Sequence, residues 1–124
     1  MHVQLSEYLA KRDLMYENQS GFRESYSTDT CLVALTDYIK GEMGKGNLVG
    51  LVLIDLQKAF DTVDHGVLLG KLESMGVSSV SWFRSYLEGR CQCVEVNGVR
   101  STFEQVTCGV PQGSILGPLL LAVD

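Results

Sequence analysis

The chain has 124 residues, a length that favours one small folded domain over two. Its hydrophobic content of 45% and charged content of 20% exclude the composition of a disordered protein. The net charge of −5 argues against a simple nucleic-acid binder, because affinity for phosphates comes mainly from lysine and arginine.

The chain has no leading basic and apolar segment and no apolar run long enough to span a membrane. These features predict an intracellular soluble protein without a membrane segment, in either the nucleus or the cytoplasm. The four cysteines are sparse and irregularly spaced, which predicts reduced thiols rather than a disulfide framework.

In chain order, apolar residues at loosely helical spacing predict a short first helix over residues 3–15. A second helix is expected from an N-cap at Ser27 or Thr28 to the glycines Gly41 and Gly44. Residues 48–54 are apolar except for Gly50 and rich in branched side chains, which predicts a strand buried on both faces.

Two further helices are expected over residues 65–75 and 79–87, and their predicted buried side chains are Val67, Leu68, Leu72, Val80, Phe83 and Leu87. Residues 91–96 and 99–106 flank Asn97-Gly98, a dipeptide typical of a type I′ turn, and predict a β-hairpin. Residues 109–114 read as a loop. The apolar run 119–124 predicts a helix cut midway that includes Asp124. The expected fold class is α+β.

Asp55 follows the predicted buried strand, where a carboxylate needs a partner because burial removes its hydration. One interpretation is a ligand for Mg²⁺, which prefers carboxylate oxygens. The other is a helix cap, or an ion-pair partner for Lys58 or Arg84.

Asp61, Asp64 and His65 follow closely, and Asp61 would share a face with either of the other two if the stretch were helical. Asp64 is equally plausible as an N-cap. His65 has no second histidine or cysteine at ligand spacing, which disfavours a metal or general-base role. Cys91 and Cys93 alternate along a strand and are interpreted as packing residues.

The loop at residues 109–114 places glycines around Gln112, which allows the backbone to approach a ligand such as a nucleotide closely. Ser114 can cap the helix that follows. The alternative is a turn that only positions that helix.

Residues 53–65, LIDLQKAFDTVDH, and residues 109–118, GVPQGSILGP, resemble two palm motifs of reverse transcriptases in the family's order. Residues 19–23, followed by Ser27-Thr28, resemble the segment before the palm in LINE-like and group II intron enzymes. The similarity runs from about residue 15 to the end, with the palm core from about residue 48. It implies a single partial domain, residues 1–124, of a non-LTR retrotransposon reverse transcriptase, with partial palm and fingers and helices packed on a small antiparallel sheet.

By that resemblance, Asp55 would bind Mg²⁺ as a catalytic carboxylate of two-metal nucleotidyl transfer. Phe60 would act as a steric gate beneath the sugar, and Ala59 would line the same floor. Gln112 would contact the incoming nucleotide, and Gly113 would let the strands approach. The implied partners of the complete enzyme are an RNA template, a DNA primer and deoxynucleoside triphosphates.

The chain departs from the family because it contains no aromatic-x-Asp-Asp tetrad. We therefore expect no polymerisation by these residues alone, and little nucleic-acid affinity for so acidic a fragment. The alternatives are a non-catalytic remnant that acts as a small protein-binding domain, and a chain that aggregates through exposed edges.

Overall fold

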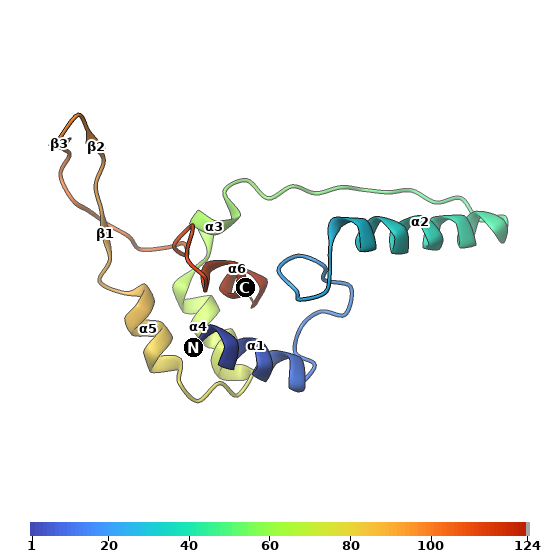
Figure 1. Cartoon of the computed structure of the whole chain (residues 1–124), viewed down its shortest axis with the longest axis horizontal. Helices are drawn as coiled ribbons and strands as arrows, with labels where there is room; N and C mark the ends of the chain where they lie inside the picture. Colours follow the sequence, from blue (N-terminus) through green and yellow to red (C-terminus); the bar gives the residue numbers. More distant parts are fainter. Residues whose placement is uncertain (124) are drawn as a thin grey trace. The chain divides into compact units, whose positions relative to one another are not determined.

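The computed structural model describes residues 1–123, which form six helices and four short strands (Figure 1). The chain divides into two compact units: unit 1 comprises residues 1–14 and the described residues from 58 onward, and unit 2 comprises residues 15–57. The expected place of Asp124 in the last helix lies outside the described residues. The elements in chain order are α1 (His2–Lys11), α2 (Thr28–Gly44), α3 (Ala59–Thr62), α4 (His65–Ser74), α5 (Val80–Leu87), β1 (Cys91–Gln92), β2 (Glu95–Val96), β3 (Val99–Arg100), β4 (Glu104–Gln105) and α6 (Gly117–Val123).

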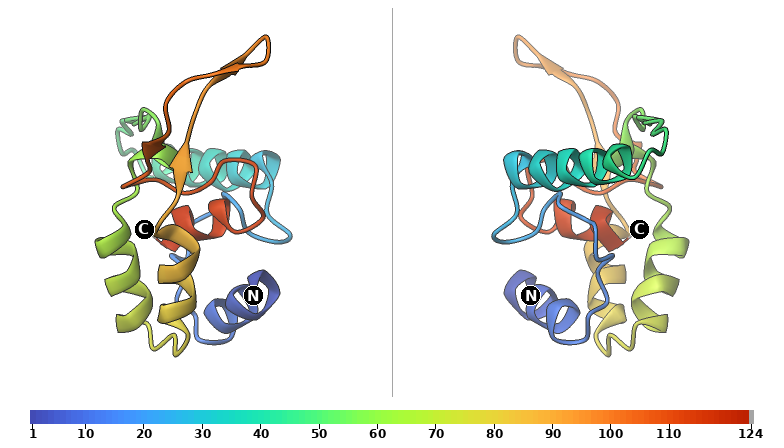
Figure 2. Two further views of the ribbon diagram at one scale, coloured as in Figure 1. Left: turned by 90° about the vertical axis from the view of Figure 1, so that its left-hand side faces the viewer. Right: turned by 90° about the vertical axis from the view of Figure 1, so that its right-hand side faces the viewer.

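Unit 1 has a core made by its helices. Helices α4 and α5 run side by side, joined by a short connection (Figures 1 and 2). Helix α6 packs against α3 and α4. In α1, the Tyr8 hydroxyl donates a 2.9 Å hydrogen bond to the Met75 carbonyl at the end of α4. The buried apolar side chains of unit 1 are Leu5, Leu9, Val63, Leu68, Leu69, Leu72, Phe83, Leu87, Val110, Leu116, Leu119, Leu120 and Val123.

Helix α4 begins where the sequence predicts, because the Asp64 carboxylate accepts a 2.9 Å hydrogen bond from the Val67 amide and caps the helix. Leu68 and Leu72 are buried as expected. Val67 is 53% exposed, and Leu69 is buried in its place. The prediction for Val67 was wrong because the buried face of α4 carries Leu68, Leu69 and Leu72, and Val67 lies outside that face. In α5, Phe83 and Leu87 are buried as predicted, and Val80 is half-buried.

The predicted hairpin is present, since β2 pairs with β3 across Asn97 and Gly98, whose φ angles are +51° and +78°. Two positive φ angles are the signature of a type I′ turn. Strands β1 and β4 form a second antiparallel pair nearer the helices (Figure 2).

Helices and antiparallel strands thus coexist, as expected for an α+β chain, but within residues 1–123 the helices pack mainly on one another, and the strands pair with strands. All four strands have exposed residues. Two-residue strands offer too few side chains on one face to cover a helix.

In unit 2, α2 begins as predicted with a capping box, because the Ser27 hydroxyl accepts from the Thr30 amide while the Thr30 hydroxyl accepts from the Ser27 amide. Upstream, the Arg23 guanidinium donates to the carbonyls of Tyr16, Glu17 and Gln19 at 3.2–3.3 Å. Arg23 therefore organises the loop that contains residues 19–23, which resemble the segment before the palm in LINE-like enzymes.

The predicted buried strand at residues 48–54 was wrong. The segment has no regular secondary structure, and Leu48, Val52, Leu53 and Ile54 are 82–102% exposed. A strand is stable only when a neighbour accepts its backbone hydrogen bonds, and no strand of residues 1–123 pairs with this segment. Asp55 is accordingly exposed rather than buried.

Within residues 1–123, no helix combines the length and the apolar character needed to cross a membrane.

Candidate functional site

In unit 1, residues 58–65 of the first motif lie against the second motif. We call residues 58–65 the α3 segment and residues 108–114 the Gln112 loop. The Val110 amide donates to the Phe60 carbonyl at 2.7 Å, and the Gly109 amide donates to the Val63 carbonyl at 2.8 Å. These two backbone hydrogen bonds hold the two segments in a defined register.

Side chains reinforce this docking from both directions. The Gln112 amide group donates a 2.8 Å hydrogen bond to the Asp61 carboxylate. The His65 Nε2 atom lies 2.8 Å from the Gly109 carbonyl oxygen, which can only accept, so this nitrogen carries the proton. Asp61 and His65 therefore hold the Gln112 loop at two positions, Gln112 and Gly109.

Gly109 is the point of closest approach between the two segments. Its φ angle is +84°, and a Cβ atom there would lie 2.9 Å from both the Cα and the carbonyl oxygen of Asp61. Only glycine satisfies both demands without moving backbone. At Gly113 the φ angle is +75° but an added Cβ would meet no atom within 4 Å, so only the backbone angle favours glycine.

The Gln112 loop leads into α6 through a hydrogen-bonded turn. The Ser114 hydroxyl donates to the Pro111 carbonyl at 2.7 Å and accepts from the Gly117 amide at 2.9 Å. The predicted capping role of Ser114 is thereby confirmed. The turn fixes the loop to a buried helix.

A cavity of about 590 Å³ opens beside the docked segments, a volume in the usual range for small-molecule sites. It is lined by the stem of the hairpin and the Gln112 loop, namely residues 90–92 and 105–112, together with Lys58 and Asp61. Lys58 and Arg90 are its two cationic side chains. Neither forms an ion pair with a carboxylate of residues 1–123.

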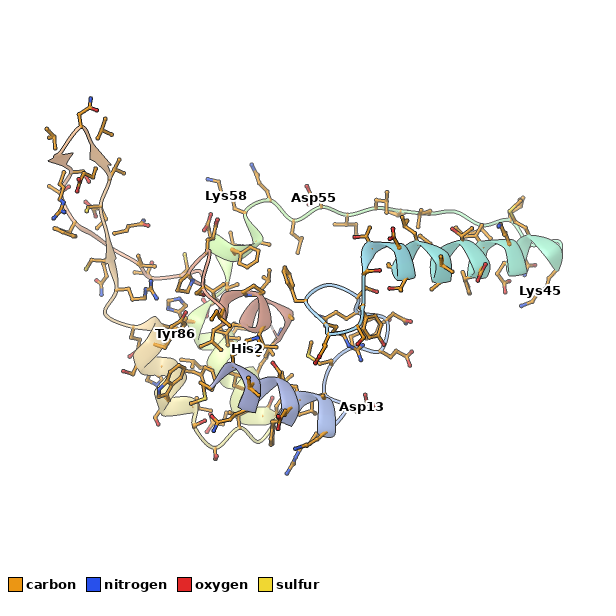
Figure 3. All side chains as sticks on the ribbon, in the orientation of Figure 1. His2, Asp13, Lys45, Asp55, Lys58 and Tyr86 are labelled. Carbon is orange, nitrogen blue, oxygen red and sulfur yellow. The ribbon has the colours of Figure 1, made fainter. Side chains whose placement is uncertain are left out.

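The predicted site residues fall in two places. Ala59 and Phe60 are half-buried in α3, and Gln112 and Gly113 are exposed on the loop. Asp55 lies in the extended segment between α2 and α3, which belongs to unit 2 (Figure 3). The structure thus brings together the predicted nucleotide-binding residues, and the site described in unit 1 does not include Asp55.

A metal ion needs several ligand side chains close together. No group of three or more histidine, cysteine, aspartate or glutamate side chains within residues 1–123 could hold a metal ion. Asp55 is one exposed carboxylate, and Asp61 already accepts from Gln112. A two-metal centre needs several carboxylates, so the described residues do not make one by themselves.

Asp61 and His65 are the residues whose roles the sequence did not reveal. Val63, with ψ at 120°, separates α3 from α4, so Asp61, Asp64 and His65 do not share one helix face as the sequence allowed. The sequence signal that could have pointed to Asp61 and His65 was their position inside the first motif, residues 53–65. Their partners, Gln112 and Gly109, lie 51 and 44 residues away, and no local pattern identifies contacts at that range.

Comparison with known proteins agrees with the two motifs. The sequence profile described as "Reverse transcriptase (RNA-dependent DNA polymerase)" matches residues 1–123. The chain is 35% identical over 120 residues to the Drosophila melanogaster protein "Probable RNA-directed DNA polymerase from transposon BS", covering 96% of this chain and 13% of that protein. It is 35% identical over 106 residues to the "RNA-directed DNA polymerase from mobile element jockey" of Drosophila funebris, covering 85% of this chain and 12% of that protein.

A third relative, "Probable RNA-directed DNA polymerase from transposon X-element" of Drosophila melanogaster, is 32% identical over 119 residues, covering 95% of this chain and 13% of that protein. The chain thus spans 12–13% of the length of these curated relatives. No solved structure matches the chain. The match over residues 1–123, together with the docked motifs, shows that the chain belongs to the reverse transcriptase family and is homologous to the polymerases of non-LTR retrotransposons.

Proposed function

We propose that this chain is the part of an RNA-directed DNA polymerase that builds the floor of its nucleotide site, with RNA as template, DNA as primer and deoxynucleoside triphosphates as substrates. The observation that carries the proposal is the docking of the α3 segment on the Gln112 loop. It places Ala59, Phe60 and Gln112 on two segments joined by hydrogen bonds of 2.7–2.8 Å. Residues held in this way meet the requirement that a catalytic site be preorganised.

Within this floor, Gln112 is the group that contacts the nucleotide. One N–H of its side-chain amide donates to the Asp61 carboxylate. The amide oxygen and the second N–H remain available to a nucleotide. Asp61 thereby fixes the direction in which the remaining donor and acceptor point. Asp61 acts through Gln112 and is a positioning residue.

Asp55 supplies one carboxylate for divalent metal ions, of which Mg²⁺ best suits oxygen ligands and phosphates. Enzymes of this family use divalent ions, but residues 1–123 do not complete a metal centre. The proposal for Asp55 is therefore limited to one ligand. Its exposure leaves the carboxylate accessible to an ion.

A graft tests the proposal directly. Residues 1–123 replace the matched segment of the jockey polymerase, and primer extension on an RNA template is measured. We expect extension by the graft, no extension when it carries Asp55→Asn, and retained extension with Asp37→Asn. Asp37 is an exposed carboxylate of the same unit and controls for the loss of one charge. A graft that extends normally with Asp55→Asn would refute the assignment of Asp55.

The steric gate is tested in the same graft. Replacing the half-buried Phe60 with valine removes ring volume beneath the sugar and should raise ribonucleotide incorporation relative to deoxyribonucleotide incorporation. The ratio of the two does not depend on the fraction of folded protein. An unchanged ratio would remove Phe60 from this role.

A further inference from the structure

The peptide unit between Gly109 and Val110 is held from both sides by the α3 segment. Its carbonyl oxygen lies 2.8 Å from the His65 Nε2 atom, and its N–H donates to the Phe60 carbonyl at 2.7 Å. Gly109 and Val110 are buried and His65 is half-buried, so both hydrogen bonds form where water reaches poorly. A peptide with a partner at each end is held in one orientation.

Gly109 makes the contact with His65 necessary. Glycine adopts many backbone conformations at little cost, and Gly109 has a φ angle of +84°. Glycine by itself therefore does not fix the direction in which its carbonyl points. The imidazole N–H of His65 fixes it, because rotation of the peptide would take a buried carbonyl oxygen away from its donor.

The orientation of this peptide reaches Gln112 through a short and stiff stretch of chain. The side chain of Val110 is buried, and the ring of Pro111 fixes its φ angle. The Pro111 carbonyl accepts a 2.7 Å hydrogen bond from the Ser114 hydroxyl. These two residues cannot absorb a rotation of the peptide before them, so the rotation would displace Gln112.

We infer that His65 is a positioning residue of the nucleotide site, which fixes the Gly109–Val110 peptide and thereby the place of Gln112. Its role differs from that of Asp61, which accepts a hydrogen bond from the Gln112 side chain and directs that side chain. His65 sets the backbone from which the side chain projects. It acts as a hydrogen-bond donor, without transferring a proton or binding a metal ion.

This inference rests on the proposed function, because Gln112 contacts a nucleotide only in a polymerase. The two fail separately, however. A graft that extends no primer refutes the proposed function, and NMR of the full chain still tests whether His65 controls Gln112. A graft that extends primers normally, in a chain where His65 does not affect Gln112, leaves the polymerase proposal intact and overturns the role of His65.

The first experiment is NMR of the full 124-residue chain. His65→Leu removes the donor, and we expect it to shift the Gly109 carbonyl carbon and the Gln112 side-chain amide. His65→Gln keeps an N–H donor of comparable reach and should leave both signals nearly in place. A folded His65→Leu chain with an unshifted Gln112 amide overturns the inference.

A second NMR measurement needs no variant to fold. Nitrogen shifts of the neutral His65 ring in the unmodified chain should show the proton on Nε2, the atom that faces the Gly109 carbonyl. A ring protonated on Nδ1 alone could not donate to this carbonyl. That result overturns the inference.

The kinetic experiment uses the polymerase graft. His65→Leu should raise the KM for deoxynucleoside triphosphate by about two- to tenfold, the effect of one hydrogen bond, and leave kcat nearly unchanged. His65→Gln should restore the original KM. Tyr8→Phe is the matched control, because it removes a 2.9 Å hydrogen bond from a half-buried side chain to the Met75 carbonyl in the same unit. Its KM should not change.

The same substitution in a Gln112→Ala graft separates positioning from a loss of folded protein. His65→Leu should leave KM unchanged there, because the side chain that it positions is missing. Partial unfolding would instead lower the amount of active enzyme without altering KM. An equal rise in KM for Tyr8→Phe, or an undiminished effect of His65→Leu in the Gln112→Ala graft, overturns the inference.

Discussion

Replacing Gly109 with alanine should destabilise unit 1 more than any exposed glycine substitution in the same loop. Holding a non-glycine residue at a φ angle of +84° costs about 1–2 kcal/mol. The new Cβ would also lie 2.9 Å from the Asp61 backbone, which must move away. That movement weakens the hydrogen bonds that Gly109 makes with Val63 and His65, each contributing about 0.5–1.5 kcal/mol.

The expected loss for Gly109→Ala is therefore about 3 kcal/mol, against about 1 kcal/mol for Gly113→Ala. Gly113 is the matched control, because its φ angle of +75° is similar but an added Cβ there meets no atom. Urea denaturation followed by fluorescence of Trp82, the one tryptophan in the sequence and a residue of α5 in unit 1, measures both. If the two variants lost the same stability to within about 0.5 kcal/mol, the close approach at Gly109 would be refuted.

Three further predictions concern the caps and the charges. Asp64→Ala should lower the free energy of unfolding of unit 1 by about 1 kcal/mol, because the Val67 amide loses its acceptor. Asp64→Asn should retain most of the stability that the cap contributes, because the asparagine side chain also offers an acceptor oxygen. Ser27→Ala should cost a similar amount, about 1 kcal/mol, and reduce the helical circular dichroism of unit 2; an unchanged spectrum and stability would refute the cap. Hydrogen bonds from the Lys45 and Asn47 side chains hold the pKa of Glu42 below its ordinary value of 4.5. This contribution to stability is present above the unfolded pKa and is lost as the pH falls through the folded one. In Lys45→Met, an NMR titration should show the Glu42 midpoint rising toward the ordinary value.

Features set by neighbouring residues could be predicted from the sequence. The hairpin follows from Asn97-Gly98, where both residues tolerate positive φ, and α4 begins at Asp64 because its carboxylate reaches an amide three residues on. Helix α2 likewise begins at its Ser27 cap. These interactions need no knowledge of the rest of the fold.

Features that depend on distant partners could not be predicted. Residues 48–54 have the composition of a buried strand, but pattern alone does not supply the neighbouring strands that would pair with it. The resemblance of the motifs predicts Phe60 and Gln112 as site residues, and the structure adds the contacts that hold their segments together. The Asp61–Gln112 and His65–Gly109 contacts arise only when the chain folds back over more than 40 residues.

The central claim is that the α3 segment and the Gln112 loop act together as one nucleotide floor, with Asp61 holding Gln112. A double-mutant cycle in the graft tests it most directly, using the KM for deoxynucleoside triphosphate in primer extension. Asp61→Ala and Gln112→Ala should each raise KM, and the double variant should be no worse than Gln112→Ala alone, because Asp61 acts only through Gln112. Fully additive effects of the two substitutions would contradict the account.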